Sequence, residues 1–160
     1  MKTVIVDWQP REQRFEARGS HTEHRIHVNA PHENGGPTGF SASDLLLAGA
    51  GACSAWDVVG ILRKQRQRVT GITVTVEGQQ ADAPPNVFER VRLVFTISGH
   101  GLNASKVRKA VELSERKYCA VVNTIRGVAD VSCDVVVLEA ESPTSGLVPT
   151  GTDAVPAASA

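Results

Sequence analysis

The chain has 160 residues, and its 17 basic side chains balance 17 acidic ones, so the formal net charge at pH 7 is zero. This balance argues against nucleic-acid binding, which needs an excess of Lys and Arg, and no apolar run approaches the ~18 residues of a membrane span. Three cysteines without a CxxC motif favour neither a disulfide scaffold nor a cysteine-rich zinc module. We therefore expect a soluble, cytoplasmic protein without a signal peptide.

Short alternating runs predict strands in the first forty residues. They cover Thr3–Trp8, Arg14–Ala17 and Arg25–Val28, with polar turns between them. Strands this short form a hairpin or meander that needs a partner surface to be stable. Residues 31–39 are rich in Pro, Gly and Asn and predict a loop.

The strongest helical signal extends from Ser43 to Gln65. Ser41 and Ser43 are both suitable N-caps, and Asp44 places a negative charge in the first turn, where the helix dipole favours it. From Leu45 to Leu62 the only charge is Asp57, so we expect this helix to be buried on almost every face. Its three glycines suggest that another backbone approaches closely.

The second half of the chain predicts two strands, a helical pair and a last strand. The strands are Gly71–Glu77 and Val87–Ser98, a helix begins after Asn103, a short helix covers Ala120–Ile125, and Val131–Glu139 is the last strand. Segregated rather than alternating elements predict an α+β fold with antiparallel sheets. Because the C-terminal segment lacks large apolar residues, we expect a folded domain over residues 1–140 and a disordered tail over 141–160.

Each cysteine, taken alone, has a structural interpretation. Cys53 lies in the middle of the long helix, where a small buried apolar residue is the simplest interpretation, although its small neighbours leave space for another molecule. Cys119 follows a helix and is by position also structural. Cys133 lies in the last strand between Val131 and Val135 on one face, and we interpret it as a core residue.

Two other patterns suggest a metal or a cofactor, and neither has the right context. His21, His24 and His27 are spaced by three, so on a strand successive imidazoles point to opposite faces and cannot converge on a metal. The segment Gly49–Ser54 imitates a dinucleotide loop, but it lacks the third glycine and lies within a helix. We therefore expect neither a metal nor a bound cofactor.

Two segments carry a family resemblance. The segment Gly39–Val59 (GFSASDLLLAGAGACSAWDVV) resembles the thiol-bearing helix of the osmotically inducible protein C / organic hydroperoxide resistance (OsmC/Ohr) family. Ser114–Cys119 (SERKYC) resembles the segment that carries the second cysteine of that family. The similarity extends from about Met1 to Leu138, and the continuation Asp57–Lys64 is most similar to the OsmC-like branch.

The resemblance implies an intertwined α+β homodimer, with the long helices back to back in the middle and the sheets outside. It also implies a thiol-dependent peroxidase that reduces organic hydroperoxides, in which Cys53 is peroxidatic and Cys119 is resolving. Cys53 would become a sulfenic acid and then form a disulfide with Cys119. An external dithiol of the lipoyl or thioredoxin type would reduce that disulfide.

The family also uses an N-terminal arginine to stabilise the thiolate, oriented by a carboxylate on the central helix. Arg14 is our first choice for the arginine and Arg11 the second, and Asp44 stands where relatives have Glu. Asp44 lies nine residues from Cys53, about 13 Å along a helix, so any link runs through the partner subunit or through an arginine that reaches across.

Two alternative functions remain open at this point. One is a non-catalytic stress or ligand-binding protein that keeps the dimer pocket and uses Cys53 only as a small buried residue. The other is a redox sensor that forms the disulfide but does not turn over with any dithiol.

Overall fold

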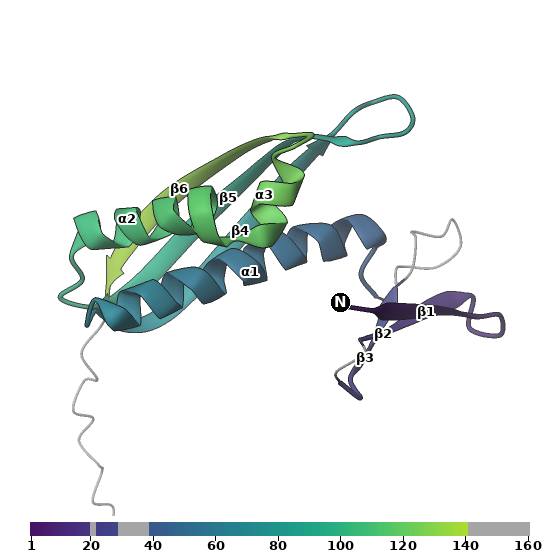
Figure 1. The fold of residues 1–160 in the computed structure, drawn as a ribbon, viewed down its shortest axis with the longest axis horizontal. Helices are drawn as coiled ribbons and strands as arrows, with labels where there is room; N and C mark the ends of the chain where they lie inside the picture. Colours follow the sequence, from purple (N-terminus) through teal and green to yellow (C-terminus); the bar gives the residue numbers. More distant parts are fainter. Residues whose placement is uncertain (20–21, 29–38, 141–160) are drawn as a thin grey trace, which may run out of the picture.

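Two three-stranded sheets and a long helix make up the fold (Figure 1). The computed structural model describes residues 1–19, 22–28 and 39–140, and most of the predicted loop at 31–39 and the predicted tail at 141–160 lie outside these residues. The N-terminal sheet consists of β1 (Val4–Gln9), β2 (Arg14–Gly19) and β3 (Arg25–Val28). The α+β class and the three short N-terminal strands are confirmed.

The N-terminal sheet has one apolar face, because successive side chains of a strand alternate between faces. Antiparallel pairing aligns Val6 with Ala17 and Ala17 with Ile26, and it aligns Trp8 with Phe15, whose ring centroids lie 4.8 Å apart. We call this the apolar face of the N-terminal sheet: Val4, Val6, Trp8, Phe15, Ala17 and Ile26. Of these six, only Ala17 is buried. The sheet projects beyond the N-terminal end of the long helix (Figure 1).

The long helix α1 extends from Ala42 to Lys64, close to the predicted range. A reciprocal capping box fixes its start, because the Asp44 amide donates to Ser41 Oγ at 3.0 Å and the Ser41 amide donates to the Asp44 carboxylate at 3.0 Å. The Ser41 hydroxyl, and after it the Ser41 amide, lower the pKa of the Asp44 carboxyl, since both favour its charged form. Arg63 and Lys64 occupy the last turn, where the helix dipole favours cations.

Within one chain α1 is buried along a single stripe rather than on almost every face. The buried residues are Ala50, Gly51, Ser54, Val58 and Leu62, whereas Trp56 on another face is 82% exposed. A Cβ on Gly51 would lie 2.9 Å from a Val76 methyl group, so this glycine marks close packing against a strand side chain. A Cβ on Gly49 or on Gly60 would meet nothing within 4 Å, so two of the three glycines mark no close approach within the described chain.

By length and composition alone α1 could cross a membrane, although its apolar run is interrupted by Asp57. Core helices of folded domains meet the same two criteria. The stripe along α1 packs into the shared core, with Val58 and Leu62 inaccessible to solvent, and this placement is that of a core helix.

The C-terminal sheet has the order β4–β5–β6, formed by Arg68–Gln80, Phe88–His100 and Asp130–Glu139. β4 and β5 are antiparallel as predicted, but β6 runs parallel to β5, so the prediction of antiparallel sheets is wrong for this pair. The helical segment between β5 and β6 serves as the crossover that a parallel pair requires. An alternating strand has the same sequence pattern in either orientation, so the pattern could not distinguish them.

The crossover consists of α2 (Ala104–Leu113), the π-helical turn η1 (Ser114–Tyr118) and α3 (Ala120–Ile125). Asn103 caps α2, which begins in the segment where a helix was predicted. The core lies between these helices, α1 and the inner face of the sheet, with Leu93, Phe95 and Ile97 of β5 at its centre. Cys133 of β6 packs half-buried against this core, and burial, together with the negative charge of Glu115, raises the pKa of its thiol to about 12.

The capping box gives a pH-dependent prediction. Ser41→Ala lowers the free energy of unfolding by about 1 kcal/mol, and Asp44→Asn lowers it in the same direction at pH 7. Because the folded state lowers the pKa of Asp44, this stabilisation is present above the unfolded carboxyl pKa and is lost as pH falls through the folded value. Denaturant unfolding of wild type and Asp44→Asn, at pH 7 and below pH ~3, measures the difference between their free energies of unfolding. Asp82→Asn, in the exposed β4–β5 turn, is the control. Equal free energies of unfolding of wild type and Asp44→Asn at pH 7 would contradict the capping role.

Candidate functional site

Two of the three cysteines meet across the fold. α1 supplies Cys53, and the junction of η1 and α3 supplies Cys119. Their Sγ atoms and a carboxylate oxygen of Asp57 all lie within 4.8 Å of one another. Both thiols are free; Cys53 is half-buried and Cys119 has no exposed surface. The structure therefore places together the two cysteines that the resemblance singled out, and it adds a carboxylate.

The π-helical turn fixes the position of Cys119. The Cys119 amide donates to the Ser114 carbonyl at 2.9 Å, which closes η1, and its Sγ accepts from the Val122 amide at 3.4 Å, which caps α3. The Asn123 side chain also donates to the Cys119 carbonyl at 2.9 Å. A π-helical turn inside a helical segment frequently marks a functional site. Here it ends α2 so that the sulfur faces α1.

Asp57 was not among the predicted site residues. It lies one helical turn after Cys53, on the same face of α1, and this spacing was the one signal in the sequence that could have found it. The Ser114 hydroxyl, which is fully buried, lies 3.2 Å from Asp57 Oδ2 and 3.3 Å from the Ser54 carbonyl oxygen. This serine therefore joins η1 to α1 beside the two sulfurs.

Burial is the main reason why the pKa of the Cys119 thiol is raised, and its contact with Cys53 raises that pKa further. The Ser54 hydroxyl and the Val122 amide act in the opposite direction, because they favour the thiolate. Ser54 Oγ is buried and makes no hydrogen bond within the described residues. It is a donor available to a sulfur anion.

The other two predicted site residues lie elsewhere. Asp44 is exposed in the capping box at the start of α1, and the structure does not bring it to the thiols. Arg14 belongs to β2 in the N-terminal sheet, which projects beyond the end of α1, whereas Cys53 is in the middle of that helix (Figure 1). The Nε atom of Arg14 is buried and makes no hydrogen bond to the described residues. Arg11 lies in the turn before β2.

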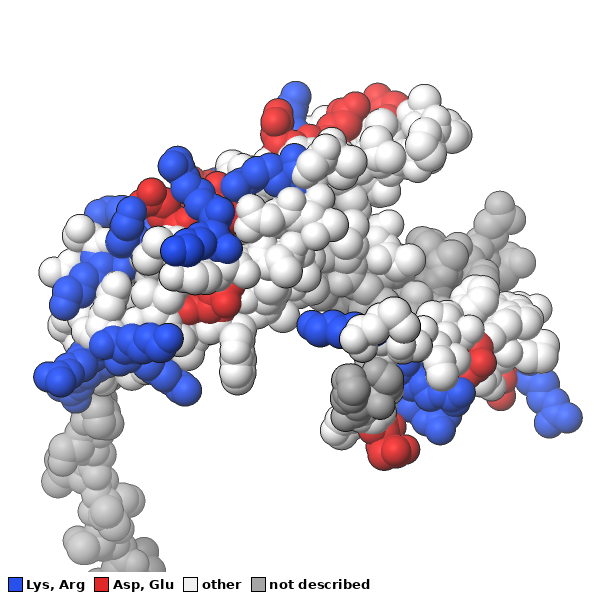
Figure 2. All heavy atoms as spheres, in the orientation of Figure 1, with Lys and Arg blue, Asp and Glu red and all other residues white. Residues whose placement is uncertain are grey.

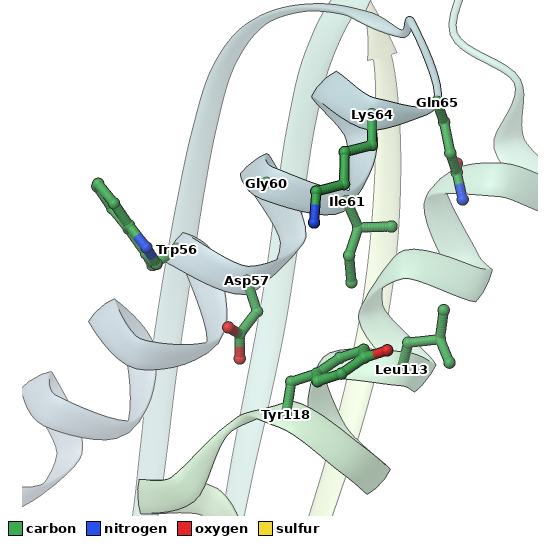
Figure 3. A pocket seen from close by; sticks show the side chains of 8 residues that line it. All are labelled: Trp56, Asp57, Gly60, Ile61, Lys64, Gln65, Leu113 and Tyr118. Atoms are coloured by element: carbon green, nitrogen blue, oxygen red, sulfur yellow. The ribbon is translucent and has the colours of Figure 1, made fainter.

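A cavity of about 490 Å³ lies between α1 and the α2–η1 segment (Figure 3). Asp57, Ile61 and Lys64 of α1 face Leu113 and Tyr118 across it, and Trp56 extends outward from α1 at its edge. Asp57 belongs both to the cysteine cluster and to the cavity wall. The cavity is therefore mostly apolar, with one carboxylate and one ammonium group, and Asp57 links it to the cysteine cluster.

Charge is distributed unevenly around this cavity, although the chain is neutral overall. Lys and Arg side chains gather over α2 and the C-terminal end of α1 (Figure 2). Exposed members of this group include Arg63, Lys64 and Arg108. The end of the cavity near Lys64 thus lies on the positively charged side of the molecule.

Comparisons with known proteins agree with this arrangement. A model of the family of OsmC-like proteins matches residues 33–134. Protein YhfA of Escherichia coli K12 is 34% identical over 99 residues, which cover 62% of this chain and 74% of YhfA. A hypothetical protein from Aquifex aeolicus VF5 is 26% identical, with a TM-score of 0.76 over 88% of this chain and 98% of that one. An organic hydroperoxide resistance protein OsmC from Legionella pneumophila shares the fold at 20% identity, with a TM-score of 0.63 over 86% and 97% of the two chains.

The matched residues cover more than half of the sequence and include Cys53, Asp57 and Cys119. The solved structures confirm the expected OsmC/Ohr fold through nearly their whole length. The chain belongs to the family of OsmC-like proteins.

Proposed function

We propose that this protein is a thiol-dependent peroxidase that reduces organic hydroperoxides, with Cys53 as the attacking thiol and Cys119 as the resolving thiol. The observation that carries the proposal is the adjacency of the two sulfurs, which belong to separate elements and lie within 4.8 Å. Relatives with the same fold include organic hydroperoxide resistance proteins from Legionella pneumophila and Bacillus subtilis. Their names support the class of reaction.

Exposure assigns the two roles. Cys53 is half-buried and can be reached by a substrate, whereas Cys119 is fully buried. The Cys53 thiolate attacks one peroxide oxygen, the O–O bond breaks, and the alkoxide leaves as an alcohol after taking up a proton; Cys53 becomes a sulfenic acid. The Cys119 thiolate then attacks the Cys53 sulfur, and the S–O bond breaks with release of water. An external dithiol of the lipoyl or thioredoxin type reduces the resulting disulfide.

The proposed substrate preference rests on the cavity that shares Asp57 with the cysteine cluster. Its walls include Ile61, Leu113 and Tyr118, and an apolar chamber favours an organic peroxide over hydrogen peroxide because burial of apolar surface stabilises the complex. No bound cofactor takes part in the proposed reaction. We further propose that it proceeds in the cytoplasm, where thiols are kept reduced.

The proposal includes a homodimer. The apolar face of the N-terminal sheet and Trp56 on α1 are exposed in one chain, and two such surfaces are unfavourable in water unless a partner covers them. A partner subunit that covers them would also bring its Arg14 toward Cys53. Asp44 uses Oδ2 for the Ser41 amide, so its other oxygen can accept a hydrogen bond from that arginine.

A stoichiometric pulse of cumene hydroperoxide tests the peroxidase. Wild type is expected to form a Cys53–Cys119 disulfide, detected by non-reducing peptide mass mapping, and to consume the peroxide faster than hydrogen peroxide. Cys53→Ser is expected to lose this consumption, because the attacking sulfur is gone, and Cys119→Ser to stop at a sulfenic acid that dimedone traps. Cys133→Ser is the matched control and is expected to behave as wild type, since its thiol lies outside the cluster.

Absence of the disulfide, together with equal peroxide consumption by Cys53→Ser and wild type, would exclude the peroxidase. A disulfide that forms but is reduced by neither dihydrolipoamide nor thioredoxin would instead support the redox sensor. The full burial of Cys119 favours that second candidate, because a reductant needs access to a sulfur.

Charge on the apolar face of the N-terminal sheet is expected to weaken the dimer. Val6→Glu places a carboxylate in the proposed interface, where its desolvation is unfavourable, and the protein is expected to shift toward monomer in analytical ultracentrifugation. Val128→Glu is the control, because Val128 is 76% exposed in the turn before β6 and outside the apolar face. Unchanged sedimentation of Val6→Glu, or an equal shift in Val128→Glu, would contradict this interface.

Loss of the activating arginine is expected to slow the first step. An opposite charge near a thiolate changes its pKa by 1–3 units, so Arg14→Gln should lower the second-order rate constant of Cys53 with cumene hydroperoxide by about tenfold or more. Arg11→Gln removes the same charge from the adjacent turn and is the matched control. Stopped-flow measurements that show the decrease only in Arg11→Gln would assign the activating role to Arg11. If neither variant reacts more slowly than wild type, neither arginine activates Cys53.

A further inference from the structure

We propose that Cys53, Asp57 and Cys119 of the reduced protein form a binding site for a thiophilic divalent cation, with Zn²⁺ as the best match. Their ligand atoms all lie within 4.8 Å of one another. In residues 1–19, 22–28 and 39–140 no other trio of cysteine, histidine or carboxylate side chains comes this close. The inference does not depend on peroxidase activity, because it concerns the dithiol before any oxidant reacts.

The distances between the three ligand atoms are compatible with a tetrahedral zinc site. Zinc binds cysteine sulfur at about 2.3 Å, so two sulfurs on one ion are about 3.8 Å apart, and a carboxylate oxygen lies at a similar distance from each. The observed distances of at most 4.8 Å require only side-chain adjustments. Cys53 and Asp57 lie on one face of α1, and the η1–α3 junction holds Cys119 opposite them.

The surrounding groups suit three anionic ligands. Ligating carboxylates in metal sites usually accept a further hydrogen bond, and Asp57 Oδ2 already accepts one from Ser114 at 3.2 Å. Ser54 is 2% exposed, and its hydroxyl makes no hydrogen bond to the described residues. It is therefore a buried donor that a metal-bound thiolate would satisfy.

The charges also favour a cation. Once both thiols have lost their protons, two thiolates and a carboxylate held this close repel one another, and a divalent cation removes most of that repulsion. The cavity has Asp57 in its wall, so an ion that enters it meets one of the three ligands. Binding releases the two thiol protons, one from each cysteine, and leaves both sulfurs bonded to the ion.

Metal binding and disulfide formation exclude each other. In the disulfide, each sulfur shares an electron pair with the other and no longer acts as a thiolate ligand. A hydroperoxide that converts the two thiolates to the disulfide takes two electrons from the sulfurs and two protons from water, and it leaves as an alcohol and a water molecule while the ion is released. The site would therefore retain the metal only while the dithiol is reduced.

The test is a Zn²⁺ titration of the reduced, untagged full-length chain against a chromophoric chelator, with Co²⁺ as a spectroscopic substitute. We expect one Zn²⁺ per chain and a thiolate-to-cobalt charge-transfer band. Asp57→Asn is expected to weaken Zn²⁺ binding by at least tenfold, and Cys53→Ser to abolish both the binding and the band. Cys133→Ser and Asp82→Asn are matched controls and are expected to bind as wild type.

Binding of wild-type affinity in Cys53→Ser or in Asp57→Asn, or a Co²⁺ complex without the thiolate band, would overturn the site. Asp57 is half-buried rather than in the core, so Asp57→Asn is informative even if a cysteine variant fails to fold. The readout uses no peroxide. A protein that binds Zn²⁺ but consumes no hydroperoxide refutes only the proposed function, and the reverse result refutes only the metal site.

Discussion

The contact between the middle of α1 and the π-helical turn at the end of α2 is the constraint on which the site depends. The buried Ser114 hydroxyl bonds to α1 at both Asp57 and the Ser54 carbonyl, and Cys119 begins α3 with its sulfur inaccessible to solvent. Close packing on both sides leaves little freedom at this junction. The two sulfurs are therefore adjacent because the core is packed, and a change in this contact would separate them.

The same packing leaves much of the apolar surface of the chain uncovered. α1 uses one stripe for the shared core, and its remaining apolar positions and the apolar face of the N-terminal sheet are left open. A chain of this composition could bury more of that surface only against another surface. The proposed homodimer accounts for this, and it would complete the site with an arginine that one chain holds away from its own Cys53.

The cluster of two thiols and a carboxylate is suited to more than one reaction of sulfur. A thiolate can attack a peroxide or bind a cation, and in both cases its charge needs stabilisation by a nearby group. Burial of Cys119 protects its sulfur from solvent but raises its pKa. The half-buried Cys53 is then the sulfur that an incoming molecule meets first, whether that molecule is an oxidant or an ion.

The sequence by itself determined the long helix and the strands of the C-terminal sheet, because each depends on local patterns: the alternation in β4 and β5 and the apolar run of α1. The structure decided that Ser41 rather than Ser43 caps α1. Resemblance supplied the family and the two cysteines. Only the tertiary structure decided that β6 is parallel, since alternation is the same in both orientations. It also showed that Asp57 rather than Asp44 lies beside the sulfurs. The sequence could not show this, because spacing along a helix fixes which residues share a face but not which element that face meets.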